Sequence, residues 1–491
     1  MTYGKVYLVG AGPGDKRLIT VKGLQCIQRA EVILYDRLVN PLLLEEAQDN
    51  VELIYCGKLP QQHTLRQEKI NDLLVAKSKE GKMVVRLKGG DPSVFGRVGE
   101  EAEILVKNGI DFEIVPGITS GIAASAYAGI PVTHRDYATS FAIVTGHQKS
   151  KDGKPKVNWA SLASSIDTIA FYMGVGNLDY IANQLVLHGK PATTPVILIQ
   201  WGTYSDQKTL EGTLENISRK ASEENFQNPA ITLVGSIVTL REKLKWFEKM
   251  PLHGKNIIVA RATAGEVDLA AELIEQGADV FQFPRFTNKS LLFDITTIKK
   301  FRKLSFYDQI LFTCPTSVEQ FFKGLTLYGI DIRNIKAEFF VKTRKTDKQL
   351  KKYGCSSRRE NELSLLRNLL IIGAKTSAAP SAPLKKRLDY LATHQLVPVE
   401  HSFETLKRLE MENRLNTVVF PSVKSISVLL HSLTEATIDP FTFFQDKKVI
   451  TFGENSYLAA VKAGLAVDCC LEEQPTVECL IDALRKERVS V

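Results

Sequence analysis

Two stretches of this chain decide the fold of its first half: Val6-Tyr7-Leu8-Val9-Gly10-Ala11-Gly12-Pro13-Gly14-Asp15 and Val84-Val85-Arg86-Leu87-Lys88-Gly89-Gly90-Asp91-Pro92-Ser93-Val94-Phe95-Gly96-Arg97. Each begins as an apolar run that predicts a buried strand, and each continues into a glycine-rich turn. Because glycine has no Cβ, a ligand can touch the backbone at such a turn. Two such turns in one half of a chain predict a backbone-lined small-molecule site.

Apolar strand patterns alternate with helical patterns throughout residues 1–248. The helical patterns include residues 18–29, 67–79 and 118–128, and Thr119 or Ser120 could cap the last of these. This alternation predicts an α/β fold with a largely parallel sheet that is covered on both faces. The predicted strands are Val6–Val9, Val32–Tyr35, Val84–Leu87, Phe112–Val115, Phe141–Val144, Thr168–Tyr172, Val196–Gln200 and Ile231–Val234.

The second half begins after a charged helical pattern at residues 240–249 and an expected linker at residues 250–254. A strand pattern at residues 256–260 restarts the alternation, and a weak repeat follows with a period of roughly 110 residues. Two copies of a long unit predict an internal duplication, with one domain at residues 255–287 plus 402–491 and a second at 288–401. The matched segments are 255–259 with 367–372, 309–315 with 417–422, and 349–354 with 458–464.

The composition is that of a globular protein, with 491 residues, 44% hydrophobic and 24% charged. No apolar run reaches the roughly 18 residues of a membrane span, and the first residues lack the order of a signal peptide, so a cytoplasmic location with no membrane partner is expected. The net charge is +8, but the basic run at residues 342–359 contains a single aromatic residue, so no nucleic-acid partner is predicted. The 7 cysteines form no CxxC pair, and no metal site is predicted.

The first glycine turn also has to be compared with a dinucleotide fingerprint, because Asp36 follows it at a suitable distance. The third glycine of that fingerprint is replaced by Asp15, and Pro13 interrupts the turn. An acidic residue at that position would repel a pyrophosphate. A cofactor without phosphates, such as S-adenosylmethionine, fits better, since backbone groups and an apolar slot can hold it and methyl transfer requires mainly positioning.

Further motifs follow these turns in order between residues 4 and 248. Together they resemble the tetrapyrrole methyltransferases, and within them the uroporphyrinogen-III C-methyltransferases. The motifs are Tyr35-Asp36-Arg37-Leu38-Val39, Pro116-Gly117-Ile118-Thr119-Ser120, Ala128-Gly129-Ile130-Pro131-Val132-Thr133-His134-Arg135, Thr145-Gly146-His147, Phe171-Tyr172-Met173-Gly174 and Pro229-Ala230. The family pattern is broken at Val98, where glycine is usual, and at Leu59-Pro60.

This resemblance implies two α/β lobes with S-adenosylmethionine between them, and a homodimer. It also implies two methyl transfers to uroporphyrinogen III, giving precorrin-2, the branch point to sirohaem and cobalamin. Asp36 would be the proton acceptor and Lys58 the proton donor. Residues implied as cofactor contacts are Pro13, Gly89, Gly90, Asp91, Val94, Thr119, Ser120, Met173, Gly202 and Ala230, and candidates to bind the substrate's carboxylates are Arg37, Lys88, Arg97, His134 and Arg135.

Several of these residues also have purely structural interpretations. Asp36 and Asp91 could be turn residues, Lys58 a surface cation, and Met173 a flexible core filler.

Residues 255–491 resemble uroporphyrinogen-III synthases, which close hydroxymethylbilane without a cofactor. The resemblance rests on Val259-Ala260-Arg261, Phe312-Thr313-Cys314, Phe420-Pro421-Ser422 and the turn at 451–457, and it makes Arg261 a candidate substrate residue. Cys314 and Pro421 depart from the family's turns, and His401-Ser402-Phe403 stands where a tyrosine is usual. A bifunctional enzyme is therefore weighed against a methyltransferase with an inactive synthase-like binding domain, and against a methyltransferase that acts on a later corrinoid.

Overall fold

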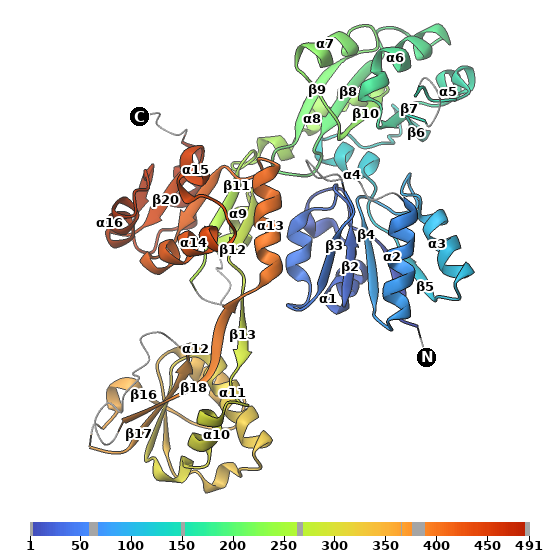
Figure 1. Ribbon diagram of the computed structural model, residues 1–491. Helices are drawn as coiled ribbons and strands as arrows, with labels where there is room; N and C mark the ends of the chain where they lie inside the picture. Colours follow the sequence, from blue (N-terminus) through green and yellow to red (C-terminus); the bar gives the residue numbers. More distant parts are fainter. Residues whose placement is uncertain are drawn as a thin grey trace. The chain divides into compact units, whose positions relative to one another are not determined.

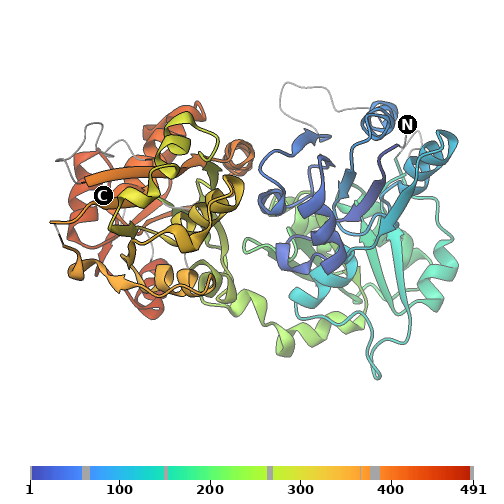
Figure 2. The ribbon, with the colours of Figure 1, turned by 90° about the horizontal axis from the view of Figure 1, so that it is seen from below.

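The computed structural model describes residues 3–57, 67–148, 153–262, 269–364, 366–375 and 388–486. These residues form four β-sheets with helices between the strands, which confirms the predicted α/β class (Figure 1, Figure 2). The described residues divide into two compact units: those within 3–262, 269–284 and 400–486 form the first, and those within 285–399 form the second. Among the described residues, no helix is both long and apolar enough to cross a membrane.

The first sheet is built around the two opening stretches of sequence. β1 (Val6–Gly10) pairs with β4 (Val84–Lys88) on one side and β5 (Phe112–Val115) on the other. Beyond β4 lie β2 (Val32–Tyr35) and β3 (Glu52–Tyr55), and every pairing is parallel. Separate apolar clusters cover the two faces, so the predicted parallel, covered sheet is confirmed here. The helices of this lobe are α1 (Val21–Arg29), α2 (Gln67–Lys79) and α3 (Val98–Lys107).

The second sheet is mixed, which corrects the expectation of a largely parallel sheet. Its order is β6-β7-β10-β8-β9, and β6 with β7 is its one parallel pairing. Only residues 201–207 connect β8 to β9, too few for a crossover helix, so β9 returns antiparallel. The strands are β6 (Phe141–Thr145), β7 (Thr168–Tyr172), β8 (Pro195–Gln200), β9 (Lys208–Thr213) and β10 (Ala230–Val234), with helices α4 (Ser120–Tyr127), α5 (Trp159–Ser165), α6 (Leu178–Leu187) and α7 (Ile217–Glu223).

The prediction of one charged helix over residues 240–249 is wrong. The stretch is divided among η4 (Ser236–Leu240), α8 (Arg241–Leu244) and η5 (Phe247–Lys249). Arg241 points inward, with a side chain that is 2% exposed and donates to Glu211 and Glu248. A buried, fully engaged arginine does not fit the solvated face of an amphipathic helix.

The third sheet, also in the first unit, is parallel throughout and has the order β12-β11-β19-β20-β21. Its strands are β11 (Asn256–Ala260), β12 (Asp279–Phe283), β19 (Thr417–Phe420), β20 (Lys448–Phe452) and β21 (Cys469–Leu471). Its helices are α9 (Leu269–Glu275), α13 (Glu400–Met411), α14 (Val423–Glu435), α15 (Pro440–Gln445), α16 (Glu454–Lys462) and α17 (Val477–Arg485).

The second unit holds the fourth sheet, with the order β13-β18-β17-β14-β15-β16. Its strands are β13 (Phe286–Ser290), β14 (Gln309–Phe312), β15 (Glu338–Val341), β16 (Arg358–Arg359), β17 (Leu369–Ala374) and β18 (Leu388–Pro398). Its helices are α10 (Ile295–Phe301), α11 (Pro315–Leu327) and α12 (Arg344–Lys351).

The third and fourth sheets share one arrangement of five parallel strands, which confirms the predicted duplication. The order β12-β11-β19-β20-β21 corresponds to β18-β17-β14-β15-β16, and β13 is an added antiparallel edge strand. The repeated sequence segments fall on matching elements: β11 with β17, β14 with β19, and α12 with α16. The helices that follow β14 and β19 begin alike, since Ser317 accepts from Cys314 N and Ser425 accepts from Ser422 N.

Candidate functional site

The two opening glycine turns lie against each other at the carboxyl edge of the first sheet. Gly12 N donates to Gly90 O over 3.2 Å, and Gly90 N donates to Gly12 O over 2.7 Å. Ala11 N also donates to Lys88 O over 2.7 Å. Because β1 and β4 are parallel neighbours, their carboxyl ends bring the two turns together.

A third turn, at Gly117, completes this junction. A Cβ on Gly117 would lie 2.3 Å from Gly90 O, and a Cβ on Gly10 would lie 2.6 Å from Gly117 N. Backbone segments this close leave no room for a side chain. The Asp91 carboxylate fastens the junction, since Oδ2 accepts from Gly117 N over 3.0 Å and Oδ1 accepts from Ser93 N over 2.7 Å. Asp91 therefore stabilises the turn, and its contact with the cofactor stays a prediction.

The bare backbone at Gly90 faces the beginning of α4. Gly90 has a φ of +69°, and a Cβ there would meet only Thr119 Cα at 3.8 Å and Ser120 N at 3.9 Å, so this place has room. The Thr119 hydroxyl makes no capping bond to α4 and instead lies 2.5 Å from Tyr172 OH. Gly90, Thr119 and Ser120, three of the predicted cofactor contacts, are therefore neighbours in the structure.

In the second lobe, two predicted cofactor residues lie in or beside left-handed backbone. Met173 has a φ of +56° and is 47% exposed, so it is not a core filler. Gly202 stands between Trp201 (φ +49°) and Thr203 (φ +73°), and a Cβ on Gly202 would lie 2.3 Å from Ala124 Cβ. Strained backbone of this kind clusters at ligand sites.

A hydrogen bond joins the first glycine turn to the second lobe, because Thr203 Oγ1 accepts from Asp15 N over 2.9 Å. Of the remaining predicted cofactor residues, Pro13 and Val94 are partly buried, Gly89 lies against Leu38, and Ala230 begins β10.

Asp36 follows β2, and its carboxylate pairs with a buried network of charged side chains. Arg86 Nη2 lies 2.6 Å from Asp36 Oδ1, Arg86 Nε lies 3.1 Å from Glu101 Oε1, and Lys88 Nζ lies 2.9 Å from that same Glu101 oxygen. Burial alone would raise the pKa of Glu101, but Arg86 and Lys88 hold it below its usual value. Charge-assisted hydrogen bonds thus fix the orientation of the Asp36 carboxylate.

In the second unit, Cys314 ends the Phe312-Thr313-Cys314 turn beside a buried histidine. Cys314 Sγ lies 3.8 Å from His394 Nε2, and Thr393 Oγ1 lies 3.2 Å from His394 Nδ1. His394 is 2% exposed, and burial lowers its pKa to about 4. The imidazole next to this turn is therefore neutral near pH 7.

Residues 5–218 match the family model described as Tetrapyrrole (Corrin/Porphyrin) Methylases. A Bacillus subtilis protein named uroporphyrinogen-III C-methyltransferase is 42% identical over 456 residues, which cover 93% of this chain and 93% of that protein. The chain belongs to the tetrapyrrole methylase family. The family resemblance of the motifs is thereby confirmed.

Two further relatives of this methylase differ in length. A Priestia megaterium uroporphyrinogen-III C-methyltransferase is 63% identical over 236 residues, which cover 48% of this chain and 98% of that protein. A Ruminiclostridium josui porphyrin biosynthesis protein HemD is 32% identical over an alignment covering 99% of this chain and 98% of that protein. The match to the first relative covers about half of this chain, whereas the match to the second covers nearly all of it.

The methylase presents some of the predicted substrate-binding residues to solvent. Arg37 and Arg135 are exposed, and so is Arg97, which pairs with Glu100. His134 is partly buried, and its Nδ1 accepts from Asp136 N over 3.1 Å.

Two of the predicted substrate residues, Lys88 and Arg261, are buried. The Lys88 side chain is 5% exposed and paired with Glu101, and burial together with the Arg86 cation lowers its pKa. Lys88 therefore balances charge inside the lobe, and its contact with a substrate carboxylate stays a prediction. Arg261 is 8% exposed at the end of β11. Lys58 and Leu59-Pro60 lie outside the described residues.

Three residues that matter to the site are absent from the sequence-based prediction: Arg86, Glu101 and Tyr172. Arg86 carried a signal, since a charged residue inside an apolar strand needs a buried partner. Tyr172 lies in a motif of the family resemblance, but its contact with Thr119 and Gly121 could not be predicted because these partners are distant in sequence. Glu101 carried no signal of its own, since its partner Arg86 lies on another element.

Proposed function

We propose that this chain methylates uroporphyrinogen III twice with S-adenosylmethionine as methyl donor, giving precorrin-2. The observation that carries the proposal is the junction of bare backbone at Gly12, Gly90 and Gly117, open beside Ser120 N. Such a site suits a nucleoside with an amino-acid tail and no phosphates. The two methyltransferase relatives bear the corresponding name, which supports the substrate.

The residues around the junction fit this cofactor. Gly90, Thr119 and Ser120 offer backbone groups in one place. The exposed Met173, which follows the Tyr172 that contacts Thr119, offers an apolar surface. When bound, S-adenosylmethionine supplies a methyl group activated by its positive sulfur. The protein's part is then to align the substrate carbon with that methyl group.

Asp36 is proposed as the proton acceptor and Lys58 as the proton donor. A pyrrole carbon that gains a methyl group leaves a cationic ring, and loss of a proton makes the product neutral. The Asp36 carboxylate is 33% exposed and is oriented from below by Arg86, so one oxygen remains available as a base. The exposed Arg37, Arg97 and Arg135, with His134, are proposed to bind substrate carboxylates. The homodimer and the cytoplasmic location stay predictions.

A second activity is proposed for residues 255–491, closure of hydroxymethylbilane to uroporphyrinogen III. It is favoured by the duplicated parallel sheets and by the alignment of the HemD relative along both halves. Closure needs mainly a folded substrate, so few reactive side chains are expected there.

One experiment tests both activities: purified protein receives hydroxymethylbilane and S-adenosylmethionine without oxygen, and the methylated product is identified. Because the bilane closes by itself to the type I isomer, methylated type III product would support both activities. Methylated type I product alone would contradict the synthase activity. Absence of methylation would contradict the main proposal, and a strong preference for a later corrinoid would replace its substrate. Asp36→Asn should lower the methylation rate by about 100-fold or more, while exposed Asp72→Asn should not.

A further inference from the structure

The C-terminal half of the first unit packs against the lobe that carries Asp36. α13 contacts η2 (Pro41–Glu46), the short helix that follows the Asp36 loop. Leu42 from η2 is 7% exposed and belongs to the same apolar cluster as Leu406 and Leu409 of α13. This contact is part of a hydrophobic core, and it gives α13 a fixed position beside the loop.

One arginine of α13 reaches the backbone that leads out of Asp36. Arg408 Nη2 donates to Val39 O over 2.8 Å and also to Arg37 O, and the side chain is 10% exposed. Both carbonyls belong to the turn that follows Asp36. The arginine therefore holds this turn from a part of the chain more than three hundred residues away in sequence.

The same guanidinium also lies on two aromatic rings. Its central carbon is 5.6 Å from the Tyr35 ring centre and 5.4 Å from that of Tyr55. Tyr35 directly precedes Asp36, and Tyr55 ends β3 shortly before Lys58 in the sequence. A cation stacked on both rings attaches the ends of β2 and β3 to α13. Arg408 thus holds the two strands that lead to the proposed proton-transfer residues.

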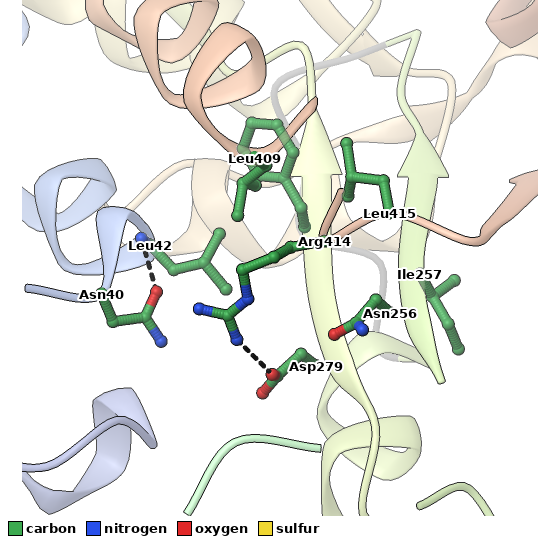
Figure 3. Close-up of a pocket in the computed structure, with 9 residues that line it drawn as sticks. Asn40, Leu42, Asn256, Ile257, Asp279, Leu409, Arg414 and Leu415 are labelled. Carbon is green, nitrogen blue, oxygen red and sulfur yellow. Dashed lines mark hydrogen bonds and ion pairs between the residues drawn. The ribbon is translucent and has the colours of Figure 1, made fainter. Parts of the chain in front are cut away.

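A second arginine, Arg414, holds the Gly202 turn. Its guanidinium carbon is 3.7 Å from the Tyr204 ring centre and 5.2 Å from that of Trp201, and its side chain is 5% exposed. Figure 3 shows Arg414 pointing at Asp279, 3.4 Å away, in a small cavity that Asn40 and Leu42 also line. Left-handed backbone at a residue such as Trp201 persists only when the surrounding structure stabilises it. The contact of Arg414 with the Trp201 ring contributes to this stabilisation.

We propose that the C-terminal half braces the methyltransferase site, with Arg408 as a positioning residue for the Asp36 turn and Arg414 as a positioning residue for the Gly202 turn. The proposal rests on the proposed function, because it assigns these turns to proton transfer and cofactor binding. Arg408 contacts carbonyl oxygens and ring faces, and Arg414 contacts carboxylates and ring faces. Both arginines therefore act through the loops. The Priestia megaterium relative bears the methyltransferase name at about half this length. The contacts of Arg408 and Arg414 are therefore a feature of the longer chain, and methyl transfer in general does not require them.

The test uses the full chain with Arg408→Met, Arg408→Lys and Arg414→Met, and Lys407→Met as the matched control. Lys407 lies on the same helix, with 39% of its side chain exposed and a pairing to Glu404. Two quantities are measured: the dissociation constant for S-adenosylhomocysteine by calorimetry, and the single-turnover rate of methyl transfer at saturating cofactor. Near-ultraviolet circular dichroism and active-site titration report the folded, competent fraction.

The proposal predicts that the two arginine substitutions change different quantities, the rate for Arg408 and the cofactor affinity for Arg414. Arg408→Met should lower the single-turnover rate by roughly tenfold and leave the dissociation constant near that of the unchanged chain. Arg414→Met should raise the dissociation constant by roughly tenfold and leave the saturated rate nearly unchanged. Arg408→Lys should recover only part of the rate, since an ammonium group cannot stack as a planar guanidinium does. Lys407→Met should match the unchanged chain.

Two results would overturn the brace. One is unchanged rate and affinity in folded Arg408→Met and Arg414→Met. The other is a loss in both variants that merely follows the competent fraction, with Arg408→Lys fully active. A failure of the proposed function looks different, because the unchanged chain itself would then bind no S-adenosylhomocysteine or transfer no methyl group.

Discussion

Arg86 Nη2 lies 2.6 Å from Oδ1 of Asp36, and Nε of the same guanidinium lies 3.1 Å from Oε1 of Glu101. One buried arginine therefore joins a partly exposed carboxylate at the site to a fully buried carboxylate in the lobe's interior. Lys88 adds the second cation, so two positive and two negative groups balance one another. The orientation of the proposed base thus depends on residues that solvent barely reaches.

Arg86→Lys tests this dependence. A lysine ammonium is a compact charge that can serve one carboxylate but not both in the fork geometry of arginine. We expect the methyl-transfer rate to fall by about 10- to 100-fold, with S-adenosylhomocysteine affinity nearly unchanged. Single-turnover assays measure the methyl-transfer rate, and calorimetry measures the S-adenosylhomocysteine affinity. Arg219→Lys, on an exposed arginine paired with Glu223, is the control. An unchanged rate in folded Arg86→Lys would mean that Asp36 needs no such support.

Gly117→Ala tests the backbone junction. The new Cβ would stand 2.3 Å from Gly90 O, so the two turns must separate by about 1 Å. We expect S-adenosylhomocysteine affinity to fall at least about tenfold and the folded lobe to lose stability. Gly99→Ala on α3, where no atom lies within 4 Å of the new Cβ, should instead stabilise the chain by about 0.5–1 kcal/mol. Calorimetry measures the affinity and urea unfolding measures the stability of both variants. Equal affinity in Gly117→Ala and the unchanged chain would remove the junction from the cofactor site.

Arg241→Met tests how much the buried Arg241, at the start of α8, contributes to stability. Glu248 is 10% exposed and would lose its Arg241 partner, and the Ala128 carbonyl would lose a donor. We expect a loss of about 3 kcal/mol in the unfolding free energy of the first unit, measured with urea. Arg219→Met should cost less than about 0.5 kcal/mol, because surface ion pairs contribute little. Similar values for both variants would show that the Arg241 contacts add no stability.

The sequence predicted four of the five strands of the first sheet, because parallel, covered strands are largely apolar runs. The edge strand β3 (Glu52–Tyr55) was missed, since it begins with a glutamate and its residues are only partly buried. The family resemblance assigned Gly90, Thr119 and Ser120 to one cofactor site, and the structure makes them neighbours. The strand β9 (Lys208–Thr213) was missed, because its sequence contains no apolar run. The antiparallel pairings of the second sheet could not be predicted either, because hydropathy does not report strand orientation. The burial of Arg241 and the pairing of Lys88 with Glu101 were also missed. The sequence alone does not show whether a charged residue faces solvent or a buried partner.

His394 provides a pH-dependent test in the second unit. Burial lowers its pKa from 6.5 to about 4 in the folded chain, so the unfolded chain takes up a proton at a higher pH than the folded chain does. The stability that the neutral imidazole contributes is complete above pH 6.5 and is lost as the pH falls toward 4. At about 1.4 kcal/mol for each pH unit, the loss reaches roughly 3 kcal/mol.

Urea unfolding of the second unit at several values between pH 7.5 and 4.5 measures this loss. His394→Gln lacks the titrating group, so the stability difference between the unchanged chain and this variant should shrink as the pH falls. His431→Gln, on a histidine whose side chain is 74% exposed, should keep the pH dependence of the unchanged chain. A difference that stays constant across this range would mean that the folded chain protonates His394 as readily as the unfolded chain does. The histidine beside Cys314 would then be charged at mildly acidic pH.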